Sequence, residues 1–291
     1  MLVSVAASAQ SFTYLNIQTD PRGVAMAGAS EALEAGAFAV DVNPAAMSLS
    51  SKSLDVQASY TMWSPKTSDL KIASLGAFYR FGKFSLGIAG RYFMEPSYDI
   101  IDANAKTTGS FTPKNIAFGL GMSYSFAEKF SVGLSARLLS FNPAEEAKVA
   151  SFAADLSFMY DGGAFKAALG LNNLGPKVTL YKEKGWADSS YSLPTMVKAG
   201  ASYSIAGFTG SAEADFIFGG SIMAGAGVEY DIAKIFAVRA GYHYGKGDAA
   251  IPSHVSVGAG VHFAGFKLDA SFIPSIGTGG SGLMFALGYS F

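Results

Sequence analysis

Apolar side chains alternate with small or polar ones along most of this chain, with a period of two residues. From Leu283 to Phe291 every second residue is large and apolar, and the residues between are Met284, Ala286, Gly288 and Ser290. A strand places successive side chains on opposite faces, so this period predicts β-strands with one apolar face. Fourteen segments show it: 53–63, 70–81, 83–94, 113–126, 129–141, 148–160, 163–172, 195–205, 207–218, 220–230, 233–244, 253–263, 265–273 and 282–291.

The lengths of these segments and of their connections indicate a membrane barrel. Most segments exceed the roughly 5–6 residues usual in soluble sheets and are long enough for a tilted strand to cross a bilayer. Tight turns occupy 81–83, 127–129, 161–163, 205–207, 231–234 and 264–266. Generally longer loops occupy 64–69, 95–112, 142–147, 173–194, 245–252 and 274–281, and the short connection near Gly219 is the exception. Alternating short turns and long loops are typical of outer-membrane barrels, with the turns in the periplasm.

The face opposite the apolar one carries nearly all of the strand charges. Its polar members are Asp55, Gln57, Arg91, Arg137, Asp155, Lys166, Lys198, Glu213, Asp215, Glu229, Arg239, His243, Lys267 and Asp269. An apolar exterior around a polar lumen predicts an all-β fold, a transmembrane fourteen-stranded antiparallel barrel in the outer membrane. The alternative is a soluble all-β repeat protein, in which apolar faces would meet each other.

Composition favours the membrane barrel. Charged residues make up 15% of the chain, against about 25% in soluble domains, and the chain has 34 Gly, 23 Phe and 14 Tyr. A net charge of −1 and the lack of a basic stripe argue against a nucleic-acid partner. The chain has no cysteine, so disulfides and thiol chemistry are excluded.

The first 52 residues do not follow the strand pattern. Residues 1–10 contain Ala7-Ser8-Ala9, which resembles a signal-peptidase site, so we expect a signal-peptide remnant or otherwise an ordinary apolar start. Residues 11–52 are Ala-rich and partly helix-permissive, and we expect a plug that packs inside the barrel from the periplasmic side. A short amphipathic linker is the alternative. The barrel itself is expected to span 53–291.

Polar residues of the lumen give no catalytic or metal site. Glu213 and Asp215 share one face and could form an acid–base pair or a cation site, but pairing with Lys198 or Arg239 is the simpler interpretation. Glu229 and Arg239 flank a short turn and are expected to form an ion pair. We expect no enzyme activity, cofactor or metal. His254 and His262 lie about 26 Å apart along one strand, at about 3.3 Å per residue, so they cannot share a metal ion. The sequence GTGGSG at 277–282 lacks the Lys and the helix of a P-loop, so it is not expected to bind a nucleotide phosphate.

Two groups of aromatic residues suggest specific roles. Trp63, Phe93 and Phe141 face inward near the loop side and are candidates for an apolar ligand path, or for simple lumen packing. Tyr289 and Phe291 end the last alternating strand, which is expected to close the barrel against strand one. This ending resembles the signal read by the outer-membrane barrel-assembly machinery, which is therefore an expected partner together with outer-membrane lipid.

A motif near the N-terminus comprises Arg22, Met26, Ala27-Gly28-Ala29 and Asn43-Pro44-Ala45. This motif resembles that of the PorV/PorQ family, a branch of the FadL-like outer-membrane proteins. The family's glycine pair is kept only as Ala27-Gly28, and Asp41-Val42 replace the aromatic residue often found before N-P-A. Asn-Pro favours a turn and the Asn side chain can cap backbone groups, so N-P-A is expected to be a structural corner of the plug.

The resemblance implies two functions. PorV-like members act in type IX secretion, where the partner is a secretion translocon or exported cargo. FadL-like relatives take up hydrophobic small molecules and use the plug as a gate. A sealed lumen with an apolar rim would favour docking, and an apolar pocket beside the plug or a lateral gap between strands would favour uptake.

Overall fold

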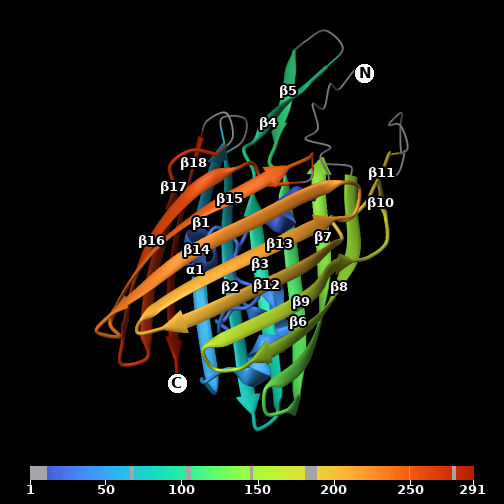
Figure 1. Cartoon of the computed structure of the whole chain (residues 1–291). Helices are drawn as coiled ribbons and strands as arrows, with labels where there is room; N and C mark the ends of the chain where they lie inside the picture. Colours follow the sequence, from blue (N-terminus) through green and yellow to red (C-terminus); the bar gives the residue numbers. More distant parts are fainter. Residues whose placement is uncertain are drawn as a thin grey trace.

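A computed structural model shows a closed barrel of fourteen antiparallel strands (Figure 1). It describes residues 12–65, 69–102, 106–144, 147–180, 189–248, 250–276 and 280–291. The barrel strands are β1 (Leu54–Pro65), β2 (Leu70–Phe81), β3 (Phe84–Met94), β6 (Lys114–Ala127), β7 (Phe130–Ala144), β8 (Ala147–Asp161), β9 (Phe165–Leu174), β12 (Met196–Ile205), β13 (Phe208–Ile217), β14 (Ser221–Ile232), β15 (Phe236–Lys246), β16 (His254–Phe263), β17 (Phe266–Ile273) and β18 (Gly280–Ser290). Each of the fourteen predicted segments is confirmed as a strand, with ends that shift by a few residues.

The last strand closes the barrel against the first, as the sequence predicts. β18 runs antiparallel to β1 in a continuous register that starts at Asp55 opposite Ser290. The backbone of Phe291 extends this pairing, because its N–H and carbonyl both bond to Leu54 at 3.0 Å. Closure pairs the backbone groups of each strand with two neighbours, which a lipid environment requires.

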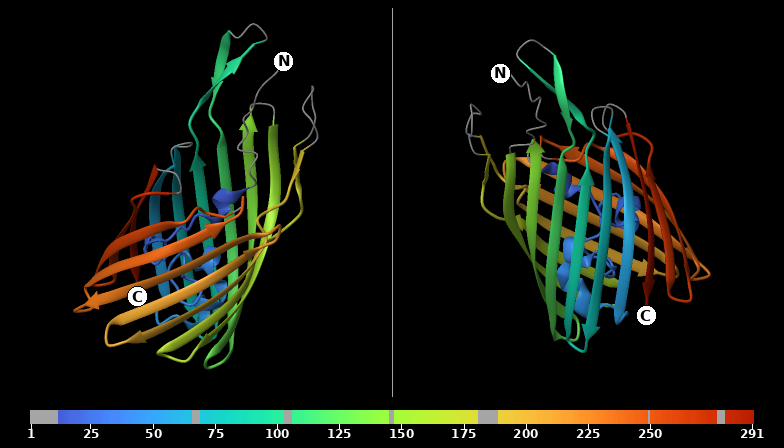
Figure 2. Two further views of the ribbon diagram at one scale, coloured as in Figure 1. Left: turned by 45° about the horizontal axis from the view of Figure 1, so that its top comes forward. Right: turned by 180° about the vertical axis from the view of Figure 1, so that it is seen from behind.

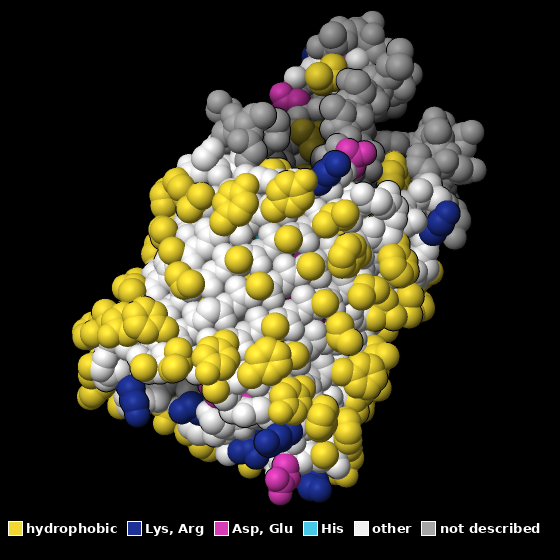
Figure 3. Space-filling model, viewed as in Figure 1, with side chains coloured by type: hydrophobic (Ala, Val, Ile, Leu, Met, Phe, Trp, Pro, Cys, Tyr) yellow, Lys and Arg dark blue, Asp and Glu magenta, His cyan; other side chains and the backbone are white. Residues whose placement is uncertain are grey.

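Hydrophobic side chains cover much of the outer wall (Figure 3), and most strand charges lie on the buried inner face. Outward side chains such as Leu138 and Leu287 are 67% and 62% exposed, whereas inward Asp155 and Arg239 are 2% and 4% exposed. Aromatic rings pair on this wall at the short-turn end, as Phe208 and Tyr230 do with ring centroids 4.3 Å apart. No helix in the described ranges is long and apolar enough to cross a membrane.

Two small hairpins extend the loop end, and the sequence pattern did not predict them. β4 (Tyr98–Ile101) pairs with β5 (Thr107–Phe111), and β10 (Val178–Leu180) pairs with β11 (Ser189–Tyr191). Their strands are only three to five residues long, too short for alternation to stand out. The expected signal peptide at residues 1–10 and Gly277–Gly279 of the Gly-rich loop lie outside the described residues.

The segment from Phe12 to Lys52, here called the plug, lies inside the barrel (Figure 2). It contains four short helices: η1 (Thr13–Asn16), α1 (Pro21–Ala25), α2 (Ala39–Val42) and η2 (Pro44–Leu49). η1 lies toward the end that carries β4 and β5, and η2 lies toward the short-turn end (Figure 2). The plug therefore runs most of the length of the lumen, farther than its expected place on the periplasmic side.

Candidate functional site in the barrel lumen

Asn43 forms a tight corner of the plug between α2 and η2. Its Oδ1 accepts the N–H of Ala45 at 3.0 Å, which caps η2, and its Nδ2 donates to the carbonyl of Glu31 at 2.7 Å. Pro44 takes the first position of η2, where the missing N–H costs little. Asn43 and Ala45 are almost completely buried. These are the contacts of the structural corner that the sequence predicts.

Ala45 rests directly on the barrel wall. Its N–H donates to Ser157 Oγ of β8 at 2.9 Å, and its carbonyl accepts from Ser131 Oγ of β7 at 2.8 Å. Gly133 of β7 lies between, and a β-carbon there would be 2.1 Å from the Ala45 nitrogen. Only glycine allows this approach, so Gly133 fixes where the corner sits.

Arg22 links α1 to the opposite side of the wall. Its Nε and Nη2 donate to the two carboxylate oxygens of Glu229 on β14, at 2.9 and 2.6 Å. Arg239 on β15 donates its Nε to the same carboxylate at 2.5 Å and its Nη1 to Asp269 at 2.6 Å. Burial lowers the pKa of Arg22, but the Glu229 carboxylate outweighs burial and raises the pKa above its ordinary value. The predicted Glu229–Arg239 ion pair is confirmed, and the motif residue Arg22 joins it.

The turn from Met26 to Ala29 follows α1 and presses against wall glycines. Gly28 has φ +87°, a left-handed conformation that favours glycine, and Ala27 adopts φ +58° with a side chain. A β-carbon at Gly225 would lie 2.2 Å from the carbonyl of Ala27, and one at Gly227 would lie 2.6 Å from the nearest plug atom. The wall is therefore recessed where the plug turns.

Wall serines bind the irregular plug backbone, whose carbonyls need partners inside the lumen. Ser59 donates to Thr19 O at 2.9 Å, Ser131 to Ala45 O at 2.8 Å, Ser202 to Ala32 O at 2.7 Å, Ser211 to Ala29 O at 2.7 Å and Ser256 to Ala25 O at 3.0 Å. The sequence analysis placed small and polar residues on the inner face but did not single out these serines or assign them partners. The alternation of side chains along each strand, which places these serines on the lumen face, was the sequence signal available for predicting these contacts.

Glu31 of the plug is completely buried against β12 and β13. Its Oε2 lies 3.0 Å from Lys198 Nζ, which lies 2.8 Å from Glu213 Oε1. Glu213 Oε2 accepts the backbone N–H groups of Ser30 and Glu31 at 2.8 and 2.6 Å. Burial raises the pKa of Glu31 to about 7, although Lys198 lowers it. The predicted pairing with Lys198 is seen for Glu213. Asp215 lies opposite Lys198 in the register of β12 and β13, but among the described residues it forms no ion pair within 4.0 Å.

A second ionic group surrounds Asp41, which sequence reasoning noted only as a departure from the family motif. Arg91 Nε donates to Asp41 at 2.8 Å, and Arg137 Nη1 lies 3.9 Å from Asp41 Oδ1. Arg137 Nη2 donates to Asp155 at 2.7 Å. Arg137 also bonds to Asn173 Oδ1 at 2.7 Å, at a bulge of β9 where Asn173 has φ +58°. The carboxylate at position 41 therefore gives two wall arginines a partner on the plug.

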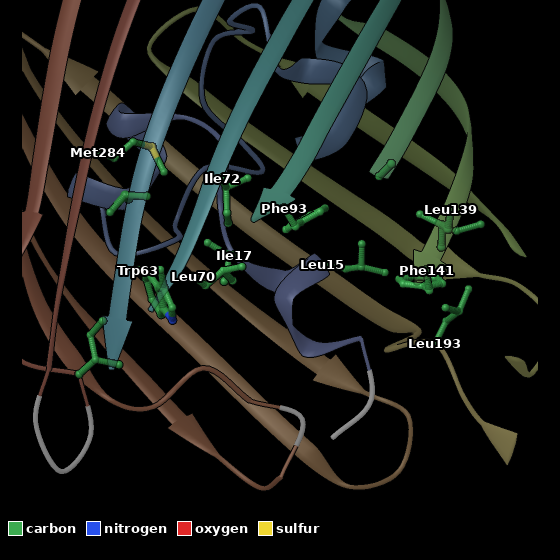
Figure 4. Close-up of a cluster of buried hydrophobic side chains, with 14 of the residues drawn as sticks. Leu15, Ile17, Trp63, Leu70, Ile72, Phe93, Leu139, Phe141, Leu193 and Met284 are labelled. Carbon is green, nitrogen blue, oxygen red and sulfur yellow. The ribbon is translucent and has the colours of Figure 1, made fainter. Parts of the chain in front are cut away.

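The aromatic residues proposed for a ligand path are packed against the start of the plug (Figure 4). Trp63, Phe93 and Phe141 are 9%, 1% and 5% exposed. The Phe12 ring centroid lies 4.1 Å from that of Phe141, and the Tyr14 centroid lies 4.6 Å from that of Phe93. With the plug in place, these residues form an apolar cluster at the loop end. Their proposed ligand role stays a prediction.

Two pockets that the described residues form inside the lumen are small. One of about 40 Å³ lies between the plug and the wall, and one of about 20 Å³ lies among plug residues. A cavity that binds benzene measures about 150 Å³, so neither pocket holds a monoaromatic ligand. A hollow of about 730 Å³ lies instead on the outer wall between β9 and β15, where Ala212, Ala226 and Ala240 leave space between larger side chains.

A match to known families decides where this plugged barrel belongs. The family described as "Type IX secretion system protein PorV" matches residues 4–208, more than half of the chain. The chain belongs to the PorV family. It is a barrel of the bacterial outer membrane with a role in type IX secretion. None of the curated proteins matches it.

Solved structures share the fold of this PorV-family chain. The toluene transporter TbuX of Ralstonia pickettii aligns with a TM-score of 0.69 and 12% identity, over 93% of this chain and 98% of that one. The Pseudomonas putida toluene transporter TodX gives 0.68 and 13%, over 93% and 97%. A Pseudomonas aeruginosa FadL homologue gives 0.61 and 12%, over 94% and 98%. At these identities the likeness shows a FadL-like barrel and leaves the ligand open.

Proposed function

We propose that this PorV-family barrel serves protein export as a closed docking platform, whose loop end binds the secretion translocon or exported cargo. The observation that carries the proposal is the filled lumen. The plug is held by ion pairs at Glu229, Lys198 and Arg91, and the pockets left beside it are far smaller than a monoaromatic ring. A barrel closed in this way offers its rim and loops for binding.

The loop end supplies a surface that projects from the membrane wall. The β4–β5 hairpin extends from this end (Figure 1), and Ile101 is 49% exposed on it. The hairpin is a two-stranded sheet, so its outer edges have no strand partner within it. Such edges and exposed apolar side chains support binding of an extended polypeptide.

Uptake of a hydrophobic small molecule is the second candidate. It is favoured by the apolar cluster at the loop end, where Trp63, Phe93 and Phe141 meet the plug, and by the fold shared with toluene transporters. In this function the plug would have to leave the lumen to open a path.

Site-specific crosslinking separates the two candidates. A photoreactive residue at Ile101 should form adducts with a translocon subunit, or with an exported protein that a deletion strain fails to present. The same residue at Leu75, 52% exposed on the lipid-facing wall, is the matched control and should not. No adduct at 101, combined with loss of toluene uptake in the deletion strain, would favour the uptake channel.

Tyr289 and Phe291 are proposed to be read by the barrel-assembly machinery. Both side chains lie on the outer wall and are 40% and 58% exposed, which supports their recognition before insertion. Phe291→Ser should lower the amount of inserted barrel in outer-membrane fractions. Phe263→Ser, at a side chain that is 69% exposed on the same wall, should lower it less, and equal losses would contradict the role.

A further inference from the structure

Three carboxylates and one lysine meet where the plug touches β9, β12 and β13. Gly170, Lys198 and Asp215 are direct neighbours across these three strands, and Glu213 lies two residues from Asp215 on the same inner face. Glu31 of the plug completes the group. Lys198 pairs with Glu31 and Glu213, whereas among the described residues no cationic nitrogen lies within 4.0 Å of the Asp215 carboxylate.

Neighbouring arginines do not neutralise the excess negative charge of this cluster. Arg91 pairs with Asp41, and Arg137 pairs with Asp155, so this adjacent group is balanced. Burying a carboxylate without a counter-charge is costly, and groups in that position usually take up a proton or pair with an ion. The cluster around Lys198 therefore lacks positive charge.

Unpartnered oxygens mark where that charge is missing. Glu31 Oε1, Asn172 Oδ1 and Asp215 Oδ1 have no hydrogen-bond partner, and each side chain is more than nine-tenths buried. The first two each lie 2.7 Å from the place where a β-carbon of Gly170 would be, so both lie beside this glycine. If the Asn172 amide were flipped, its N–H could donate to Glu31. The flip would not change the charge of the cluster, which would still contain three carboxylates and one lysine.

A small pocket lies beside these oxygens. It measures about 40 Å³, and its lining includes Asn172, Lys198 and Asp215 together with Arg91 and Arg137, but not Glu31. A volume of this size holds a water molecule or a small ion. Carboxylate and amide oxygens attract protons and hard cations. Within the described ranges, no group of three or more His, Cys, Asp or Glu is arranged to hold a metal ion.

We propose that this cluster binds one further positive charge, a proton or a small monovalent cation, between Glu31, Asn172 and Asp215, and that this charge locks the plug to the wall. The lock follows from the contacts, because Glu31 belongs to the plug and Glu213 holds two plug N–H groups. The site is a property of the filled lumen and stands whether or not the loop end binds an export partner.

The direction of the effect on stability follows from linkage. Lys198 of β12, Glu213 and Asp215 of β13 and Asp155 of β8 all face Glu31. If the charge is a proton, the folded protein holds a proton that the unfolded chain has released. Stability then falls as pH rises from about 4.5, the ordinary value for Glu, through the raised pKa of Glu31 at about 7. If it is a cation, stability falls when the small cation is removed.

The experiment measures the temperature at which the full chain in detergent loses its folded band on SDS gels. One arm varies pH from 5 to about 8.5. The other arm, at high pH and fixed ionic strength, replaces Na⁺ or K⁺ by choline, which is too large for the pocket. We expect the midpoint to fall with rising pH if the charge is a proton, or with choline if it is a metal cation. A midpoint temperature that changes neither with pH nor with the replacement of Na⁺ or K⁺ by choline would overturn the proposal.

Variants assign the effect to this cluster. Asp215→Asn and Glu31→Gln each remove one excess carboxylate and should flatten the dependence by more than half. Asp99→Asn, at an exposed position of β4 in the loop-end hairpin, is the matched control and should keep the wild-type dependence. An Asp215→Asn protein whose midpoint temperature depends on pH or on the small cation as strongly as that of the wild type would also overturn the proposal. If a variant fails to fold, the measurements on the wild-type protein still test the proposal.

Discussion

Arg22 and Glu229 stand 207 positions apart in the chain and form a two-bond ion pair across the lumen, with N–O distances of 2.9 and 2.6 Å. The pair joins α1 of the plug to β14 of the wall. It shows how this fold is organised, because a motif at the N-terminus has its partner inside the barrel.

Glu229→Gln is expected to loosen the plug. The change leaves Arg22 and Arg239 without their shared carboxylate, and losing one partner of a buried pair costs about 3–5 kcal/mol. The Arg22 side chain is 25% exposed, so we expect the lower end of that range. The midpoint temperature of the folded band on SDS gels should fall, whereas Asp99→Asn at an exposed position of β4 should leave it unchanged.

Gly133→Ala is expected to displace the Asn43-Pro44-Ala45 corner. The new β-carbon would meet the Ala45 nitrogen at 2.1 Å, and overpacking typically costs about 1–3 kcal/mol. Gly90→Ala is the matched control, because a β-carbon there meets nothing within 4 Å. Protease cleavage within the plug of reconstituted protein should increase for Gly133→Ala alone. Equal cleavage in both variants would mean that the corner does not depend on this glycine.

The barrel was largely predictable from sequence, because alternation is a local property of each strand. Leu283 to Phe291 already showed which face of β18 is outward. The plug contacts were not predictable in the same way. Ser211 meets Ala29 across 182 positions, and nothing local to either residue reports the other. Arg22 and Asn43 could be singled out by their motif, while Glu31 and Asp41 gave no periodic signal.

Phe93→Ala tests whether the loop-end cluster packs the lumen or conducts a ligand. Phe93 is 1% exposed and touches Tyr14 of the plug, so its loss should destabilise the protein by about 3–5 kcal/mol. Toluene uptake by cells should not change if the cluster is only packing. Phe118→Ala, on the lipid-facing wall at 45% exposure, controls for loss of an aromatic ring. A clear change in uptake with Phe93→Ala alone would assign the cluster to a ligand path.

Removing residues 12–48 should open the barrel. This deletion takes away most of the plug, including Arg22, Glu31 and Asp41, while the strands start at Leu54. Single-channel recording in planar bilayers should show little current for the full chain and a stable, larger conductance for the deletion. Equal conductance of the two proteins would show that the plug does not close the lumen.

The most direct test of an export role compares two phenotypes in one deletion strain complemented with the full chain or with an empty vector. Surface display of exported proteins and uptake of toluene are measured in the same cultures. We predict that the strain without this barrel loses surface-displayed proteins and takes up toluene at the rate of the complemented strain. Normal surface display together with reduced toluene uptake would contradict the export role and assign the barrel to transport.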